Sequence, residues 1–485
     1  MRRRLGLAAA LLLGSPVAQA RGVDGAALDA ILARLPAGAR IGLLVVDETG
    51  NVVAQRNADA RMVPASTTKL FTTAAALALL PATDQPDATG GASVTLEGSP
   101  RAPDVVLRGH GDARLSSAPD CRSDCLATLA DAVAARTRRV GRVIGDDSAM
   151  ADERWPSGMS WDNMATVSGT AVSALTLDDN IAVAQVTGGA EGAPARIEPP
   201  AGIGLSGTIL TGTDPTAKPQ TGTPQTATTQ TGTPQPAITR STLPGSDTWR
   251  LSGVVPSGTT LRLSLSVADP AARAAAVLRA MLVARGVTVD GAALARHRAD
   301  DGPPAEPAPL ARLIPPPLVQ DVALTLRQSQ NLHAELLLRR LTPSGTVTAG
   351  IAARNTALAP VGFAPGSVSL HDGSGMSTHN RVTPRALVAL LRWGQAQPWG
   401  ATWLDGFPVA GRSGTLKGRL RGTALDGKLR AKTGTLLGTQ TLAGILPATD
   451  GHRLTFAVLV GDLPGGTSAT PVVDALLLAL GAGAG

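Results

Sequence analysis

Tyrosine is absent from this 485-residue chain, cysteine occurs only twice, and aromatic residues make up 2% of the sequence. Leu, Val, Ala and Ile must therefore build the hydrophobic core. Beyond the N-terminus, no stretch reaches the ~20 apolar residues that a membrane-spanning helix needs. The chain also lacks a dense Lys/Arg block with interleaved aromatic residues, which argues against nucleic acid as a partner. Its length is ample for a large core and more than one domain.

The N-terminus carries the features of an export signal. Residues 2–4 are arginines, residues 5–13 are apolar, and an A-x-A motif occupies residues 18–20. This pattern predicts a cleavable signal peptide over residues 1–20 and a soluble exported protein, with an uncleaved anchor as the alternative. The formal net charge of +7 falls to about +4 without the three leader arginines. A mildly basic protein of this kind would suit anionic cell-wall polymers, although the charge alone is a weak indication.

The two cysteines, Cys121 and Cys125, lie close together in the sequence. An oxidising compartment favours a local disulfide between them. Because this spacing gives poor disulfide geometry on a regular helix, a loop is expected between them if they pair. No histidine is spaced nearby to complete a metal site.

Hydrophobic periodicity indicates a chain of mixed helices and strands. Helices are expected at residues 23–35, 66–80, 126–138, 271–285, 315–341, 383–395 and 471–480. Strands are expected at residues 41–47, 52–56, 105–109, 142–145, 260–267, 287–289, 367–370, 429–436, 439–446 and 453–463.

Two stretches are typical of linkers. Residues 211–240 are rich in Thr, Pro and Gln, with T-G-T-P-Q at residue 221 and again at residue 231. Such a composition cannot bury enough apolar surface to offset the entropy of ordering, which predicts a flexible excursion. Residues 300–309 are rich in Pro, Ala and acidic residues and predict a second linker.

Ser66 and Lys69 lie three residues apart at the start of a stretch that favours a helix. Residues 71–80 are rich in Ala and Leu and end at Pro81, as expected for a helix that a proline terminates. Positions i and i+3 share a helix face, so the lysine amine can reach the serine hydroxyl. A lysine can activate a serine once burial lowers the pKa of the amine. Taken alone, a serine and a lysine at this spacing more often mark the solvent-exposed start of a helix than a catalytic pair.

Two further motifs follow in order along the chain. Residues 329–331 have the pattern S-x-N, and residues 432–434 are K-T-G. S-x-x-K, S-x-N and K-T-G together are the signature of penicillin-binding proteins and serine β-lactamases. Each motif is weak alone, but the three in this order, on a helix, a loop and a strand behind a leader, form a specific pattern.

One stretch imitates the third motif. Residues 412–415, R-S-G-T, are followed by charged, turn-like sequence, whereas residues 432–435 continue into alternating strand sequence. We therefore favour Lys432 over Arg412 as the residue of the K-T-G motif.

Another stretch imitates a Ser-His-Asp triad, because His371 and Asp372 lie beside Ser374. The G-x-S-x-G elbow is missing, and adjacent residues on a strand point to opposite faces. Turn roles for the glycines at 373 and 375 are the favoured interpretation.

The long interval between Lys69 and Ser329 indicates which family within this superfamily the chain resembles. A long insertion there resembles the low-molecular-mass D-alanyl-D-alanine carboxypeptidase/endopeptidases of the penicillin-binding protein 4 group, peptidase S13. Similar tracts are P-A-S-T-T-K at 64–69, G-D-D-S at 145–148, W-P at 155–156, D-G-S-G-M-S at 372–377 and A-K-T-G-T-L at 431–436. The resemblance covers essentially the whole mature chain. It departs from the family at Gln330, where the family often has Asp, and in the Thr/Pro/Gln-rich tract.

The resemblance implies an α+β fold. A serine β-lactamase/transpeptidase-like domain would contain a five-stranded antiparallel sheet flanked by helices, with two strands from residues 41–56 and three from residues 429–463. The first and last helices would pack together on one face. This catalytic domain would comprise residues 21–85 and 300–485. Residues 86–299 would form one or two mostly-β accessory domains between the first and second motifs.

The resemblance also implies catalytic roles for the first two motifs. Ser66 would be the acylated nucleophile and Lys69 its general base. Ser329 would relay a proton to the leaving amine, and Asn331 would hydrogen-bond the substrate amide.

The third motif would bind substrate. Lys432 would supply positive charge, the hydroxyl groups of Thr433 and Thr435 would bind the terminal carboxylate, and Gly434 would let the backbone approach closely. The backbone N–H groups of Thr435 and of the nucleophile would form the oxyanion hole.

The implied function is that of a periplasmic serine-type D-Ala-D-Ala carboxypeptidase and endopeptidase. It would act on peptidoglycan stem peptides and cross-links through an acyl-enzyme, bind β-lactams covalently, and need no metal or organic cofactor. A non-catalytic wall-binding or β-lactam-sensing protein on the same fold is the alternative, against which the intact Lys69 and Asn331 argue. A β-lactamase, which needs fast deacylation, is a third interpretation. The balance of the two peptidase activities and the oligomeric state stay open at this point.

Overall fold

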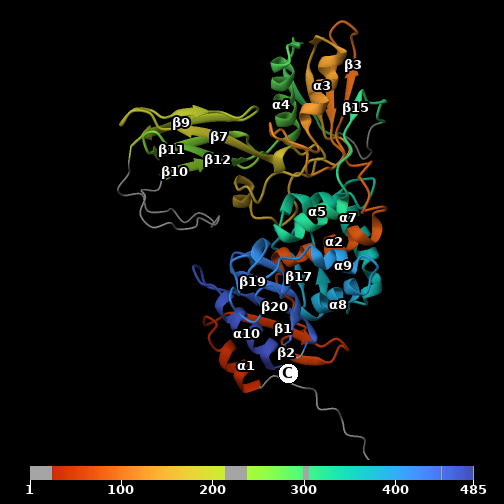
Figure 1. Cartoon of the computed structure of the whole chain (residues 1–485), viewed down its shortest axis with the longest axis vertical. Coiled ribbons are helices and arrows are strands. Elements are labelled where there is room, and N and C mark those ends of the chain that lie inside the picture. Colours follow the sequence, from red (N-terminus) through yellow and green to blue (C-terminus); the bar gives the residue numbers. More distant parts are fainter. Residues whose placement is uncertain (1–24, 213–236, 299–304, 449–450, 484–485) are drawn as a thin grey trace, which may run out of the picture.

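The computed structural model describes residues 25–212, 237–298, 305–448 and 451–483 (Figure 1). At its base lies a five-stranded antiparallel sheet with the strand order β18-β19-β20-β1-β2. Its strands are β1 (Arg40–Val46), β2 (Val52–Arg56), β18 (Arg430–Leu436), β19 (Thr439–Pro447) and β20 (Arg453–Gly461). Both ends of the chain therefore meet in one sheet, which confirms the predicted arrangement of two early and three late strands.

Helices cover both faces of this sheet. On one face α1 (Gly25–Leu32) packs against α10 (Thr470–Gly483), as predicted, and on the other α8 (Pro384–Gln395) lies across β20. The residues of β20 from Leu454 to Val460 are all buried. Burial on both sides explains why this strand is a nearly continuous apolar run rather than an alternating one.

A layer of helices lies above the sheet, with α2 (Thr68–Leu79) at its centre (Figure 1). Helix α2 contacts α5, α6, α7 and α8, and its residues from Thr68 to Leu77 are buried. Its many alanines let these neighbours approach closely. The other helices of the layer are α5 (Leu318–Arg327), α6 (Asn331–Arg339), α7 (Val347–Ala357) and α9 (Gly400–Asp405), with the 3₁₀ turn η4 (Ala359–Val361). A further 3₁₀ turn, η5 (Gly414–Leu416), contacts β18, and its Leu416 belongs to the apolar cluster that includes α10.

The predicted single helix over residues 315–341 is wrong, because the chain breaks between α5 and α6. Ser329 has a positive φ of 63°, which a right-handed helix of L-residues does not accommodate. Gln330 is extended and caps the start of α6. The break places Ser329 on a tight corner and Asn331 in the first turn of α6.

The insertion contains two units. The first, at the top of Figure 1, is a sheet of order β14-β6-β4-β3-β15 with α3 (Leu126–Arg136) and α4 (Pro270–Ala284). Its strands are β3 (Ser93–Glu97), β4 (Asp104–Arg108), β6 (Val143–Asp146), β14 (Ala293–Arg296) and β15 (Ala311–Arg312), with a small pair of β5 (Arg139–Val140) and β13 (Thr288–Val289) beside them.

The second unit projects to the left in Figure 1 and consists of two three-stranded sheets of orders β10-β11-β9 and β12-β7-β8. Their strands are β7 (Ile181–Thr187), β8 (Arg196–Glu198), β9 (Gly204–Thr211), β10 (Ala237–Ser241), β11 (Thr248–Val255) and β12 (Thr260–Ser266). Buried apolar side chains of both sheets, Trp249 and Leu265 among them, form one cluster between the sheets. The 3₁₀ turns η2 (Trp161–Ala165) and η3 (Asp178–Asn180) precede the unit, and a short pair of β16 (Val368–Ser369) and β17 (Arg381–Val382) lies elsewhere in the chain.

Two predicted boundaries need correction. Strand β15 pairs with β3 of the inserted unit, so this unit reaches past the boundary predicted at residue 300. Strand β9 ends at Thr211 and β10 pairs with β11, so strands occupy both ends of the tract predicted as flexible over 211–240. The rest of that tract, residues 213–236, and the predicted signal peptide lie outside the described residues.

Cys121 and Cys125 form a disulfide in the loop that leads into α3. The predicted local pairing across a loop is thus confirmed. Among the described residues, no helix is long and apolar enough to cross a membrane.

Candidate active site

The first motif lies where a strained turn enters the buried helix α2. Ser66 is the middle residue of the 3₁₀ turn η1 (Ala65–Thr67), and this turn leads directly into α2. Ala65 has a positive φ of 47°, a backbone conformation that costs of order 1–3 kcal/mol in a non-glycine residue and is often found at functional sites. The hydroxyl of Thr67 donates to the carbonyl of Pro64 at 2.7 Å. The turn presents the half-buried Ser66 at the start of the helix.

Lys69 lies one turn further along and is fully buried. Its Nζ is 2.9 Å from Ser66 Oγ, 2.6 Å from Asn331 Oδ1 and 2.6 Å from the carbonyl oxygen of Ser374. These three acceptors match the three donors of an ammonium group. The amine therefore joins the first motif, the second motif and the loop around Ser374.

The environment of Lys69 makes its amine easier to deprotonate. Burial lowers the pKa of Lys69 from 10.5 to about 7, and the negative charges of Asp372 and Glu335 oppose part of that shift. Desolvation disfavours the ammonium form, and neighbouring carboxylates favour it. A substantial fraction of the amine is therefore neutral near pH 7 and can accept the proton of Ser66.

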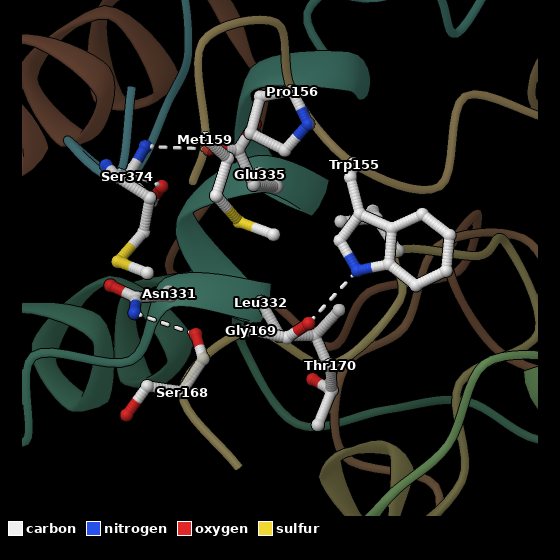
Figure 2. Close-up of a pocket in the computed structure, with 12 residues that line it drawn as sticks. Trp155, Pro156, Met159, Ser168, Gly169, Thr170, Asn331, Leu332, Glu335 and Ser374 are labelled. Carbon is white, nitrogen blue, oxygen red and sulfur yellow. Dashed lines mark hydrogen bonds between the residues drawn. The ribbon is translucent and has the colours of Figure 1, made fainter. Parts of the chain in front are cut away.

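The second motif is held by the insertion as well as by the catalytic helices. Asn331 Nδ2 donates to the carbonyl of Ser168 at 2.8 Å (Figure 2). Gln330 Nε2 donates to Asp179 Oδ2 at 3.2 Å. Ser329, with its positive φ, and Gln330 lie outside any helix or strand. The contacts of Gln330 and Asn331 with the insertion therefore help to fix the position of this turn.

Lys432 brings the third motif to the second. It is fully buried on β18, and its Nζ donates to Ser329 Oγ at 2.8 Å and to the carbonyl of Thr433 at 2.7 Å. Burial, and then the charge of Lys69, hold the pKa of Lys432 well below its usual range. The charge of Lys69 thus adds to burial in disfavouring the charged form of Lys432.

Gly434 allows β18 to lie directly against the nucleophile turn. A Cβ atom at this position would meet the backbone N of Ser66 at 2.9 Å and the carbonyl oxygen of Pro64 at 2.8 Å. Thr441 on the adjacent strand donates to the same carbonyl at 2.8 Å. The strand and the turn are therefore in contact along their backbones, and glycine is required by the close approach.

A polar hollow opens beside β18. Five threonine hydroxyl groups and one guanidinium line most of it. The lining residues are Thr415, Arg419, Thr433, Gly434, Thr435, Gln440, Thr441 and Thr470. Thr433 Oγ1 is 2.7 Å from Thr415 Oγ1. Hydroxyl groups next to a guanidinium suit a carboxylate.

The side chains that made the two stretches look catalytic, Arg412 and His371, take no part in this arrangement. The Arg412 side chain is exposed and pairs with Asp426 at 3.3 Å. His371 Nε2 lies 3.3 Å from Ser369 Oγ. Asp372 instead accepts backbone N–H groups, from Gly375 at 3.0 Å and from Ser377 at 2.7 Å, so it stabilises a turn, as the glycines at 373 and 375 suggested.

The sequence analysis missed several contributors. The carbonyl oxygens of Ser168 and Ser374 accept from catalytic-motif side chains, and no side-chain pattern reveals such a role. Thr415 belongs to the stretch that was set aside as an imitation. The tract around Ser374 did carry a signal, because it was among those similar to the family. Among the described residues, no group of three or more His, Cys, Asp or Glu side chains could hold a metal ion.

Comparisons with known proteins find similar sequences along most of the chain. A family model described as the D-Ala-D-Ala carboxypeptidase 3 (S13) family matches residues 25–476. A D-alanyl-D-alanine carboxypeptidase of Actinomadura sp. (strain R39) is 32% identical over 473 residues, which cover 92% of this chain and 82% of that protein. The D-alanyl-D-alanine carboxypeptidase DacB of Haemophilus influenzae is 23% identical over 460 residues, covering 91% and 90%.

Solved structures share the fold. The crystal structure of penicillin binding protein 4 from Haemophilus influenzae matches with a TM-score of 0.75 at 21% identity, covering 93% of this chain and 97% of that one. A structure of the same protein in complex with a β-lactam matches with a TM-score of 0.71 at 22% identity, covering 93% and 98%.

Proposed function

The chain belongs to the D-Ala-D-Ala carboxypeptidase 3 (S13) family, and from this premise we propose that it is a serine-type D-Ala-D-Ala carboxypeptidase and endopeptidase of peptidoglycan. The observation that carries the proposal is the position of Lys69, whose Nζ lies within 2.9 Å of both Ser66 Oγ and Asn331 Oδ1. A buried amine between a serine and an amide-binding asparagine suits acyl transfer. The relatives named D-alanyl-D-alanine carboxypeptidase support the carboxypeptidase part of this proposal, and the predicted export signal supports a periplasmic role on peptidoglycan.

Acylation begins with proton transfer from Ser66 Oγ to the neutral amine of Lys69. The serine oxygen attacks the carbonyl carbon of the penultimate D-Ala and forms a tetrahedral oxyanion. The backbone N–H groups of Ser66 and Thr435 stabilise this charge, a contribution of about 10²–10³ in rate per donor in comparable sites. The approach of β18 to the nucleophile turn at Gly434 supports that arrangement.

The bond to the leaving D-Ala nitrogen then breaks, and the amine needs a proton. Ser329 Oγ can deliver it and be resupplied by Lys432, whose Nζ is 2.8 Å away. Because the charge of Lys69 lowers the pKa of Lys432, Lys432 becomes a stronger acid once Lys69 has accepted the serine proton. Water then attacks the Ser66 ester and passes its proton through Ser329 to the neutral amine of Lys432, while Ser66 Oγ takes its proton back from Lys69. The acid product leaves, and both lysines return to their starting protonation states.

Substrate binding is assigned to the hollow beside β18. The hydroxyls of Thr433 and Thr435, with the guanidinium of Arg419, would hold the terminal carboxylate. Asn331 would bind the substrate amide and orient it toward the serine. A β-lactam has the same carboxylate and an acylating amide, so covalent binding of penicillin at Ser66 follows from the same geometry.

Product analysis tests the proposed activity. Purified peptidoglycan incubated with the enzyme should release free D-alanine and should lose cross-linked muropeptides, both seen by mass spectrometry. Peptides ending in L-Ala-L-Ala should remain intact, because stereochemistry at the scissile bond places the carbonyl against Ser66. Absence of both products together with tight penicillin binding would support the alternative, a β-lactam-sensing protein on this fold.

The pKa of Lys69 predicts the pH dependence of acylation. Since the base must be neutral and its pKa is about 7, the second-order rate of penicillin acylation should rise between pH 6 and pH 8 and level off above. Well below the pKa, the rate should fall about tenfold per pH unit. Stopped-flow or gel-based labelling at each pH measures this, with melting temperature recorded alongside to exclude unfolding. A rate that is flat or falling from pH 6 to pH 8 would contradict Lys69 as the base.

A further inference from the structure

Glu335 is a buried carboxylate next to the catalytic motifs for which the steps above have no use. It lies on α6 four residues after Asn331, on the same face of the helix, and is only 2% exposed. A carboxylate in such a position is costly to bury unless it is well hydrogen-bonded. Its contacts therefore call for an explanation.

One oxygen of this carboxylate holds the loop that contacts Lys69. Glu335 Oε1 accepts the backbone N–H group of Gly373 at 3.0 Å. It also accepts the backbone N–H group of Ser374 at 2.8 Å (Figure 2). The carbonyl of Ser374 in turn accepts from Lys69 Nζ at 2.6 Å. The carbonyl of Gly373 accepts from Thr72 Oγ1 at 2.7 Å, one turn further along α2. The loop is thus tied to α6 through its amides and to α2 through its carbonyls.

The other oxygen is left without a protein partner. Glu335 Oε2 is buried and has no hydrogen bond within the described residues. The side chain borders a small hollow with Asn331, Trp155 and Met159 (Figure 2). Substituting an amide nitrogen at this oxygen would therefore disrupt no existing contact.

The negative charge of Glu335 also affects the pKa of Lys69. Its charge and that of Asp372 are the two influences that keep the pKa of Lys69 from falling further than about 7. Burial, and then Asp372, raise the pKa of Glu335 itself to about 7. The other charged groups around this pair are Arg339 on α6, Arg354 on α7, Asp372 in the loop and Lys432 on β18.

We propose that Glu335 is a positioning residue for Lys69. Its carboxylate holds the backbone N–H groups of Gly373 and Ser374 and so fixes the Ser374 carbonyl that accepts a hydrogen bond from the lysine amine. Its negative charge also stabilises that amine in the protonated form. The inference rests on the proposed function, in which Lys69 is the base for Ser66. Geometry and charge can be separated by experiment, because glutamine keeps an oxygen that can accept both N–H groups while removing the charge.

The first variant is therefore Glu335→Gln, measured through the pH dependence of penicillin acylation. Loss of the charge favours the neutral amine, so the acid limb should move to lower pH by roughly 0.5–1 unit, with the plateau rate within a few-fold of wild type. The limb should also become a simple one-proton titration, since Glu335 and Lys69 no longer titrate as a coupled pair.

Glu335→Asp tests the geometry. It keeps the charge but shortens the side chain, so its oxygen no longer reaches both amides at hydrogen-bonding distance. The plateau rate should fall about tenfold or more while the midpoint of the acid limb stays in place. Should Glu335→Gln fail to fold, by melting temperature and circular dichroism, this variant still decides, because an unchanged plateau would overturn the positioning role.

Glu306→Gln is the matched control. Glu306 is also a carboxylate with several hydrogen-bond partners, Ser93 at 2.9 Å, His110 at 2.9 Å and Arg312 at 2.7 Å, but it lies with the inserted unit. The Glu306→Gln variant should change neither the acid limb of the pH–rate profile nor the plateau rate of acylation. A Glu335→Gln enzyme with a lower melting temperature and an unmoved limb would show a purely structural role and overturn the inference. If wild-type Ser66 is not labelled at all, the proposed function fails instead, so the two failures are distinguishable.

Discussion

Replacing Ser66 with alanine should abolish covalent labelling by penicillin and lower D-alanine release by roughly 10⁴-fold or more. The serine oxygen is the atom proposed to become acylated, and it is the only hydroxyl within hydrogen-bonding distance of the Lys69 amine among the described residues. No neighbouring group can replace it. Fluorescent penicillin followed by tryptic mapping should place the label on the peptide that contains Ser66 in the wild type.

The fold should survive this substitution. Ser66 Oγ is half-buried and its hydrogen bond in the structure is with Lys69, so the melting temperature should remain near that of the wild type. Ser374→Ala is a matched control, because Ser374 contributes its carbonyl to Lys69, whereas its hydroxyl contacts Asp372 and the N–H of Met376. This control should retain the label. A label that maps to Ser374 or Ser413, or near-normal D-alanine release by Ser66→Ala, would sink the assignment of the nucleophile.

The catalytic sheet could be predicted because its strands differ sharply from their surroundings. The strands β19 and β20 contain apolar runs, β18 carries the K-T-G motif and is joined to them by a short turn, and the early pair β1 and β2 flanks an obvious turn. That the two groups join across more than 370 intervening residues does not follow from any local pattern. It came from the resemblance carried by the three motifs.

The helix prediction failed where a local conformation overrides periodicity. Leucine and alanine continue at helical spacing through Ser329, so the pattern indicates one helix. The positive φ of Ser329 is sustained instead by contacts from distant residues, such as Asp179 to Gln330 and Lys432 to Ser329. Such strain at a corner that carries a motif is consistent with a functional position, and a single sequence does not reveal it.

The motif side chains could be identified by their type and order, but their supports could not. Glu335 acts on backbone N–H groups nearly forty residues away in the chain, and Asn331 donates to the carbonyl of Ser168 in the insertion. Backbone partners leave no side-chain pattern. The insertion, which the sequence analysis treated as accessory, therefore contributes directly to holding the second motif.

Replacing Lys432 with alanine should lower the acylation rate by about 10²–10³ while Arg412→Ala keeps it within about twofold. Lys432 is fully buried and its Nζ contacts Ser329 Oγ at 2.8 Å, so its loss removes both the proton supply for the leaving group and a positive charge beside the substrate carboxylate. The effect should appear in kcat and in the rate of penicillin labelling alike. Rates for both variants, measured with the same D-Ala-D-Ala peptide at pH 8, test this expectation.

Arg412 is the natural control because its R-S-G-T context imitates the K-T-G motif. Its side chain is exposed and pairs with Asp426 at 3.3 Å, and exposed ion pairs of this kind contribute at most about 1 kcal/mol to stability. Arg412→Ala should therefore leave both activity and melting temperature nearly unchanged. The decisive comparison is the ratio of the two rates: if Arg412→Ala lost most turnover while Lys432→Ala kept it, β18 would not be the strand that binds substrate. Retention of labelling with loss of peptide hydrolysis in Lys432→Ala would instead confine its role to the leaving amine, because a β-lactam keeps its leaving nitrogen tethered after ring opening.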